Sequence, residues 1–167
     1  MNDLDNIRQY LAEQDAKRRA NRKQPYRKPE SIKELERLHY ERQQARNPGF
    51  CHLKTMFRDD SSNSLTQCIV AWLELHGHFA GRVNTTGIYN QKLKKYIHSG
   101  SRRGMADITS VVDGKHVSIE IKHGRDKMRP EQLKVKAGIE AAGGIFIVAS
   151  SFDNFLEQIK LITQKAQ

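Results

Sequence analysis

The sequence predicts an α/β fold in which a mixed β-sheet is flanked by helices, with the element order α-β-β-β-α-β-α from residue 64 onward. Apolar residues recur at helical spacing over residues 64–76 and again from residue 152. Between these segments the dipeptide Asp113-Gly114 joins two apolar stretches, which is a strong short-range signal of a β-hairpin. A continuous apolar run at residues 145–149 indicates a strand buried on both faces.

The first helix of this domain is predicted over residues 64–76. Leu65, Cys68, Ile69 and Trp72 follow the i, i+3, i+4, i+7 spacing of one apolar helix face. Around this helix the sequence predicts an N-cap at Asn63 or Ser64, a stop at Gly77, a short strand over residues 78–84 and a long polar connection from Thr85 to Gly104.

The hairpin strands are predicted over residues 106–112 and 116–122. In the second strand Val117, Ile119 and Ile121 alternate toward the core, so the residues between them should lie on the other face. A helix before the last strand implies a crossover, and hence a mixed sheet with helices on both sides. The remaining elements are a helix from Pro130 to about Ala142, a stop at Gly143-Gly144, and a helix with apolar residues Phe152, Phe155, Leu156 and Ile159 and a capping-box spacing at Ser150 and Asp153.

The chain changes character near residue 60, which predicts a basic N-terminal arm over residues 1–60 and a compact domain over residues 61–167. Two polar helices are expected in the arm, one presenting Leu4, Ile7 and Leu11 and the other Ile32, Leu35, Leu38 and His39, with a proline-interrupted basic linker at residues 21–29 between them. Three roles stay open for this helical, partly disordered extension. It can follow a phosphate backbone, pack on the domain or a partner, or remain a solvated pair of helices.

Composition favours a polyanionic partner. The 167 residues carry 29 Lys and Arg against 19 Asp and Glu, a formal net charge of +10. The excess lies in the first three quarters of the chain, whereas residues 131–167 hold four bases and four acids. The charge balance fits nucleic acid or an anionic membrane surface as the partner, and the asymmetry indicates one basic face or arm beside an ordinary globular end.

Membrane insertion and secretion are not expected. No apolar run approaches the roughly 18 residues of a transmembrane helix, and the first twenty residues lack the apolar stretch of a signal peptide. Two cysteines, Cys51 and Cys68, cannot form a disulfide framework and fit a reducing interior. We therefore expect a cytoplasmic protein, with the nucleoid or the cytoplasm of a phage-infected host as possible places of action.

Chemistry is predicted at the open end of the hairpin. Glu120 and Lys122 leave the same face of one strand, and Asp107 begins the other strand, opposite roughly residues 119–121 when counted outward from the turn. Two carboxylates, the backbone carbonyl of Ile121 and several waters would form a Mg²⁺ site, which Mn²⁺ could also occupy. Lys122 could orient or help to deprotonate a metal-bound water and stabilise developing negative charge.

These residues carry a resemblance to a known family. Gly104-Met105-Ala106-Asp107-Ile108, followed by Ile119-Glu120-Ile121-Lys122, resembles the PD-(D/E)XK nuclease superfamily and, more narrowly, its VRR-Nuc type of phage and DNA-repair proteins, over residues 64–160. Three further segments are similar to motifs of that type: residues 81–87, the Arg129-Pro130-Glu131-Gln132 stretch and the glycine turn at residues 141–144.

The resemblance implies a restriction-endonuclease-like core and metal-dependent hydrolysis of phosphodiester bonds, with DNA as the expected nucleic acid. It implies that Asp107 and Glu120 bind the metal, that Lys122 is the catalytic lysine and that Gln132 supports the site. Homodimerisation, or a replication or repair partner, is left open. Two departures are the absence of a carboxylate in Ser64-Leu65-Thr66-Gln67, where the family often has a glutamate, and Arg129 in place of a capping serine.

Basic residues around this site are the expected nucleic-acid contacts, and Tyr89 and Tyr96 among the lysines of the polar connection suit the same role. The alternative function is a nucleic-acid-binding or regulatory protein that keeps the fold without turnover. Two adjacent repelling carboxylates argue against it, because an inactive site has no physical reason to keep them. The expected contacts are Arg82, Asn84, Lys92, Lys94, Lys95, Arg102, Arg103, Arg125, Lys127 and Arg129.

Overall fold

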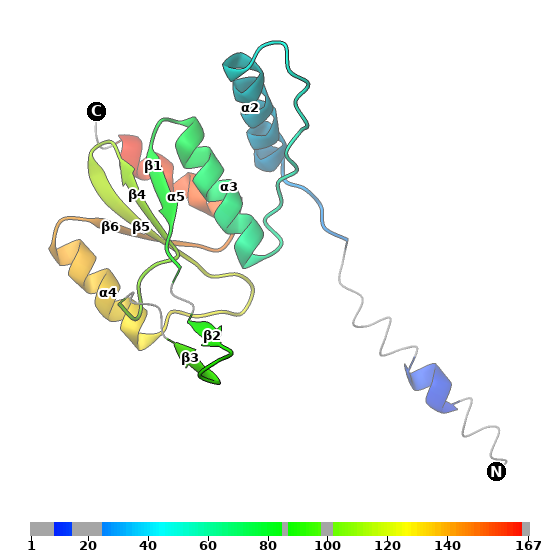
Figure 1. Cartoon of the computed structure of the whole chain (residues 1–167), viewed down its shortest axis with the longest axis vertical. Coiled ribbons are helices and arrows are strands. Elements are labelled where there is room, and N and C mark those ends of the chain that lie inside the picture. Colours follow the sequence, from blue (N-terminus) through cyan, green and yellow to red (C-terminus); the bar gives the residue numbers. More distant parts are fainter. Residues whose placement is uncertain (1–8, 15–24, 85–86, 98–101, 165–167) are drawn as a thin grey trace.

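The computed structural model describes residues 9–14, 25–84, 87–97 and 102–164, and it confirms the mixed α/β organisation (Figure 1). The predicted order from residue 64 is also confirmed, with a small hairpin inserted after the first strand. A short helical stretch at residues 9–14 precedes the other elements. These are α2 (Glu30–Arg46), α3 (Ser62–Leu75), β1 (Phe79–Arg82), β2 (Ile88–Asn90), β3 (Lys95–Ile97), β4 (Ile108–Val112), β5 (Lys115–Ile121), α4 (Pro130–Ala141), β6 (Ile145–Ala149) and α5 (Phe152–Gln164).

The main sheet is mixed, as predicted, with the strand order β1-β4-β5-β6. β1, β4 and β5 pair antiparallel, whereas β5 and β6, which α4 connects, pair parallel. The turn between β4 and β5 has positive φ at both central residues, +48° at Asp113 and +75° at Gly114. This is the backbone of a tight turn whose twist matches the flanking strands, and it fixes Ile108 opposite Ile119.

The two faces of the sheet differ in what covers them. Val117, Ile119 and Ile121 point into the main core, which also contains side chains of α2, α3 and α5. The opposite face of β5 carries Ser118 and Glu120, and it lies toward α4, whose Gln132 contacts Glu120. In Figure 1 α4 lies apart from α3 and α5. This second, smaller interior holds the candidate site.

Residues 25–60 pack on the domain, which is one of the three roles that the sequence leaves open for the N-terminal extension. Ile32 and Leu35 of α2 are 0% and 1% exposed and belong to the main core, and α2 lies beside α3 (Figure 1). Asp59 joins the segment to α5, since its Oδ1 accepts from Tyr26 Oη at 2.9 Å and its Oδ2 from the amide of Phe152 at 3.2 Å. The lack of an apolar majority in α2 hid this packing, because two buried residues suffice to anchor it.

Parts of the predicted arm lie outside the described residues. These are residues 1–8, which include Leu4 and Ile7, and residues 15–24, which include the first four residues of the predicted linker. Leu11, the third residue of that expected helix face, is 57% exposed.

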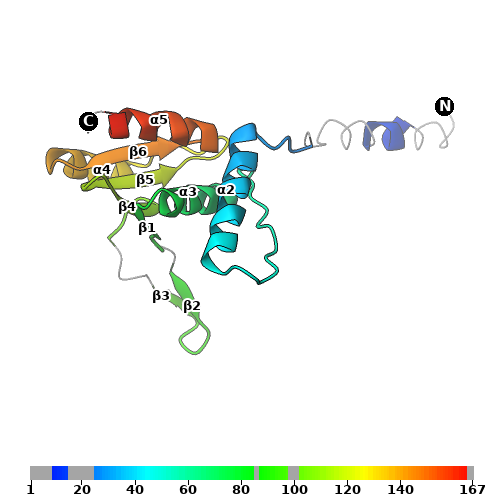
Figure 2. The same cartoon turned by 90° about the horizontal axis from the view of Figure 1, so that it is seen from above.

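The polar connection predicted over residues 85–104 contains a second hairpin, β2–β3, which projects from the domain in both views (Figures 1 and 2). Its turn forms because Asn90 Oδ1 accepts from the amides of Lys92 and Leu93, both at 3.0 Å, and Lys94 adopts φ +48°. Residues 85–86 and 98–101 of the connection lie outside the described part of the chain.

Two helix caps differ from the predictions. Ser61 caps α3, because its side chain accepts from the amide of Ser64, whereas Asn63 and Ser64 lie inside the helix. Ser151 rather than Ser150 accepts from the first turn of α5, at the amide of Asn154 (3.1 Å). Adjacent capping residues differ only in backbone conformation, which the sequence pattern does not resolve. Within the described ranges, no helix has the length and apolarity needed to cross a membrane.

Because Ile32 and Leu35 of α2 belong to the main core, truncation of these side chains should destabilise the whole domain. We expect Ile32→Ala and Leu35→Ala each to lower the free energy of unfolding by about 2–5 kcal/mol, as for other buried large-to-alanine changes. Urea unfolding followed by circular dichroism measures this. Leu11→Ala, at an exposed position, is the control and should change stability by less than about 0.5 kcal/mol. Unchanged stability in the two α2 variants would mean that α2 is a separate arm.

Candidate active site

The register of β4 and β5 brings Asp107 to Glu120. Ile108 lies opposite Ile119, so Asp107, one residue before β4, falls beside Glu120 on the other strand. Asp107 Oδ2 accepts from the amide of Ile121 at 2.9 Å, which fixes the carboxylate at the sheet edge. The juxtaposition predicted from the hairpin is therefore present in the structure.

Glu120 lies at the centre of the site and is only 2% exposed. Its Oε1 accepts from Lys122 Nζ at 2.9 Å and from the side-chain amide of Gln132. Its Oε2 is buried and has no hydrogen-bond partner within the described ranges. A buried carboxylate oxygen without a partner is costly, and such an atom is a candidate ligand for a cation.

Lys122 is buried too, at 8% exposure. As the sequence predicts, it shares a face with Glu120, and α4 covers that face. Besides Glu120, the ammonium contacts Asp126 Oδ2 at 3.1 Å. Sequence reasoning missed Asp126, which lies in the turn after β5, where the only available signal was an acid four residues after the lysine.

Gln132 links the site to α4. It is in the first turn of that helix, where its Oε1 accepts from the amide of Arg129 at 2.9 Å while its amide nitrogen donates to Glu120. Gly104 allows the chain leading to Asp107 to pass close to the same turn. It has φ +82°, and a Cβ there would lie 2.6 Å from the backbone of Glu131.

The charges of the site act on one another. Burial raises the pKa of the Glu120 carboxyl, and the nearby charge of Asp107 raises it further, while hydrogen bonds from Lys122 and Gln132 oppose the rise. Burial alone would lower the pKa of Lys122, but its hydrogen bonds to Glu120 and Asp126 outweigh this effect and the pKa is raised. The same lysine lowers the pKa of Asp126. Lys122 therefore carries its proton at neutral pH.

The donor set fits a hard divalent cation. Asp107 Oδ1 has no hydrogen bond among the described residues, and Glu120 Oε2 is unpartnered. Because the Lys122 amide donates toward β6 at Ala149, the carbonyl of Ile121 in the same trans peptide faces the opposite way, toward β4 and Asp107. Two carboxylates and one carbonyl, completed by water, match the way proteins hold Mg²⁺. No group of three or more His, Cys, Asp or Glu residues suited to a metal occurs within the described ranges.

The predicted nucleic-acid contacts are all exposed. β1 ends, β4 begins and β5 ends at the same end of the sheet, so Arg82 and the loop after β5 adjoin the carboxylates. Arg102, in contrast, lines a cleft with His116, Gly138 and Gly144, beside the later turns of α4 and the starts of β5 and β6. Arg82 also donates to Asn63 Oδ1 at 2.6 Å. The exposed set comprises Arg82 and Asn84 after β1, Lys92, Lys94 and Lys95 in the hairpin, Arg102 and Arg103 before Gly104, and Arg125, Lys127 and Arg129 before α4.

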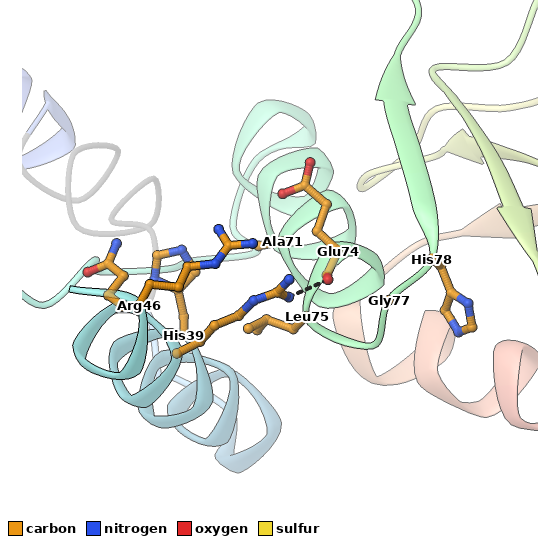
Figure 3. Close-up of a pocket in the computed structure, with 9 residues that line it drawn as sticks. His39, Arg46, Ala71, Glu74, Leu75, Gly77 and His78 are labelled. Atoms are coloured by element: carbon orange, nitrogen blue, oxygen red, sulfur yellow. Dashed lines mark hydrogen bonds between the residues drawn. The ribbon is translucent and has the colours of Figure 1, made fainter. Parts of the chain in front are cut away.

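A separate cleft of about 520 Å³ lies between α2 and the end of α3, lined among others by His39, Arg42, Arg46 and Glu74 (Figure 3). Arg42 partly fills it by donating to the backbone carbonyl of Glu74. Gly77 and His78, which also line it, precede β1, so this cleft is at the opposite end of β1 from Arg82. It holds none of the predicted site residues.

Comparison of the chain with models of protein families, with characterised proteins and with solved structures gives no match.

Loss of the buried lysine should destabilise the protein in a pH-dependent way. Lys122→Met keeps the aliphatic stem but removes the positive charge that stabilises ionised Glu120. The pKa of Glu120 therefore rises further. A group with a raised pKa in the folded state loses its stability contribution as the pH increases through that value. The loss of unfolding free energy should therefore be less than about 1 kcal/mol near pH 4 and about 3 kcal/mol near pH 8.

Lys136→Met is the matched control for this prediction. Its ion pair with Glu140 is exposed and 3.9 Å long, so its loss should change stability by less than about 0.5 kcal/mol at either pH. Urea unfolding over this pH range measures both variants. If both substitutions lowered the free energy of unfolding equally and independently of pH, this would contradict a stabilising buried Lys122–Glu120 ion pair.

Proposed function

We propose that the chain is a Mg²⁺-dependent nuclease that hydrolyses phosphodiester bonds, with DNA as its substrate. The observation that carries the proposal is the arrangement of Asp107, Glu120 and Lys122 at one sheet edge, where a buried oxygen of Glu120 lacks a hydrogen-bond partner among the residues that the structure describes. This arrangement places anionic metal ligands and a cation next to exposed basic residues. A phosphodiester substrate needs both, because its own charge must be held and the negative charge that develops during hydrolysis must be stabilised.

Each residue has a distinct part in the proposed reaction. Asp107, Glu120 and the carbonyl of Ile121 would hold the cation, which, when bound, would polarise the phosphate and lower the pKa of an attacking water. Lys122 stays protonated, so its part is to orient the phosphate and stabilise developing charge rather than to accept a proton. Gln132 fixes Glu120 from α4, and Asp126 holds Lys122 from the loop.

The family resemblance supports the same proposal. Gly104-Met105-Ala106-Asp107-Ile108 and Ile119-Glu120-Ile121-Lys122 resemble the motifs of the PD-(D/E)XK nucleases of the VRR-Nuc type. The mixed α/β organisation of the domain is compatible with that resemblance. Free thiols at Cys51 and Cys68 agree with an intracellular site of action.

A non-catalytic nucleic-acid-binding role is the competing function. It is favoured by one observation, that Glu120 Oε1 is already engaged by Lys122 and Gln132. Cleavage assays separate the two functions, because both predict binding and only one predicts turnover.

We expect Glu120→Gln to reduce cleavage of labelled DNA in Mg²⁺ by about 10²-fold or more, because the variant lacks an anionic metal ligand. DNA affinity measured in chelator should change little. Glu131→Gln, which removes the same charge from an exposed position of α4, should cleave as the wild type does. Wild-type turnover by Glu120→Gln, or no cleavage by the wild-type protein in Mg²⁺ or Mn²⁺, would contradict the proposal.

Cation binding should also appear as stabilisation without any substrate. With Mg²⁺ at about ten times its dissociation constant, the folded state gains about 1.4 kcal/mol, which raises Tm by about 3–6 °C. The rise should vanish in Asp107→Asn and persist in Asp113→Asn, a matched change in the β4–β5 turn. Because the pKa of Glu120 is raised, protons compete with the cation and the rise should shrink as pH falls. Equal Tm shifts in the two variants would exclude Asp107 as a ligand.

A further inference from the structure

The β2–β3 hairpin exposes apolar and aromatic side chains that nothing in the described chain covers. Tyr96 is 70% exposed, Leu93 57%, Tyr89 49% and Ile97 44%. An isolated two-stranded hairpin is marginally stable in water. These side chains are exposed, so they do not form a hydrophobic core that would account for them. They indicate a binding surface.

The two tyrosines form an ordered unit. Tyr89 lies directly opposite Tyr96 in the antiparallel pair, so both rings are on the same hairpin face. Their centroids are 5.2 Å apart with an interplanar angle of 61°, an edge-to-face contact. A base placed between two rings would need about twice the 3.4 Å stacking distance of nucleic acids, so no base fits between them. The available surface is the outer face of Tyr96, which Tyr89 orients.

The charge of the hairpin selects the class of partner. Residues 87–97 contain Lys92, Lys94 and Lys95 and no acidic residue. All three lysines are exposed. Aromatic rings beside cations are the combination that binds single-stranded nucleic acid, because bases stack on the rings while the lysines meet the phosphates. In a duplex the base faces are covered by their neighbours, so only an unpaired nucleotide can use such a ring.

The hairpin is also placed to act beside the candidate site. It is inserted between β1 and β4, the strands whose adjoining ends carry Arg82 and Asp107, and it projects from this part of the domain (Figures 1 and 2). The hairpin therefore leaves the domain near the strand ends that carry the carboxylates, so a nucleic acid bound at the site could also reach the hairpin.

We propose that the β2–β3 hairpin is a stacking platform for unpaired nucleotides, with Tyr96 as the contact and Tyr89 as the positioning residue, so that preferred substrates contain a single-stranded segment. This inference rests on the proposed function to the extent that both require nucleic-acid binding. It adds the form of nucleic acid that the chain selects.

Fluorescence anisotropy of the full chain in chelator tests the platform without cleavage. The probes are a labelled single strand of about 15 nucleotides, as DNA and as RNA, and a blunt duplex of the same sequence. Tyr96→Ala should weaken single-strand binding roughly tenfold and duplex binding less than about twofold. Tyr96→Trp should bind single strands as the wild type does, because it keeps a stacking face.

Leu93→Ala is the matched control, since it removes exposed apolar surface from the same hairpin without removing a ring. It should change single-strand affinity less than about twofold. An equal loss in Leu93→Ala and Tyr96→Ala, an equal loss on single strand and duplex, or no loss in Tyr96→Ala would overturn the platform. So would Tyr96-dependent binding to phosphatidylglycerol vesicles in a protein that binds neither DNA nor RNA.

The platform and the nuclease activity can fail separately. Tyr96-dependent single-strand binding by a chain that cleaves nothing supports the platform and contradicts the nuclease. Mg²⁺-dependent cleavage with unchanged single-strand binding in Tyr96→Ala supports the nuclease and overturns the platform. Selection of DNA over RNA, or of neither, supports the platform provided that the Tyr96 dependence is present.

Discussion

The site depends on the antiparallel register of β4 and β5. Positive φ at Asp113 and Gly114 allows a two-residue turn, and that turn sets Ile108 opposite Ile119. A shift of one residue would move Glu120 to the core face and separate it from Asp107. The bond from the Ile121 amide to Asp107 holds the carboxylate just beyond the last ladder pair. Local turn chemistry thus determines where two residues thirteen positions apart meet.

The chemical properties of Glu120 depend on its burial. α4 covers the face that carries Glu120, which raises the pKa of that carboxyl and strengthens its interaction with Lys122. Gln132 and Asp126 then hold the two charges from either side. Two carboxylates in a poorly solvated place repel each other, and a divalent cation between them would relieve the repulsion. The same burial that destabilises Glu120 as an isolated anion would make it a strong ligand.

The sequence was sufficient for the four strands of the main sheet and the helices from residue 61 onward, because its periodicities, the Asp113-Gly114 turn and Pro130 each act locally. It was also sufficient to bring Asp107 to Glu120, since a tight hairpin leaves one register. The sequence did not reveal that Glu120 and Lys122 are buried. Their burial under α4 depends on long-range packing rather than on strand alternation. For the same reason the packing of α2 on the domain was only one of three alternatives, as Ile32 and Leu35 are few among many polar residues. The β2–β3 hairpin was missed because Asn90 and Lys94 form its turn without glycine.

A crystal of the full chain soaked in Mn²⁺ tests the central claim most directly, because anomalous scattering locates the ion without reference to activity. The account predicts one anomalous peak between Asp107 and Glu120 Oε2, next to the carbonyl of Ile121. A Glu120→Gln crystal treated in the same way should have no peak there. An empty site in the wild-type crystal, with the Glu120–Lys122 ion pair intact in Mn²⁺, would contradict the assignment of these carboxylates as a metal-binding catalytic site.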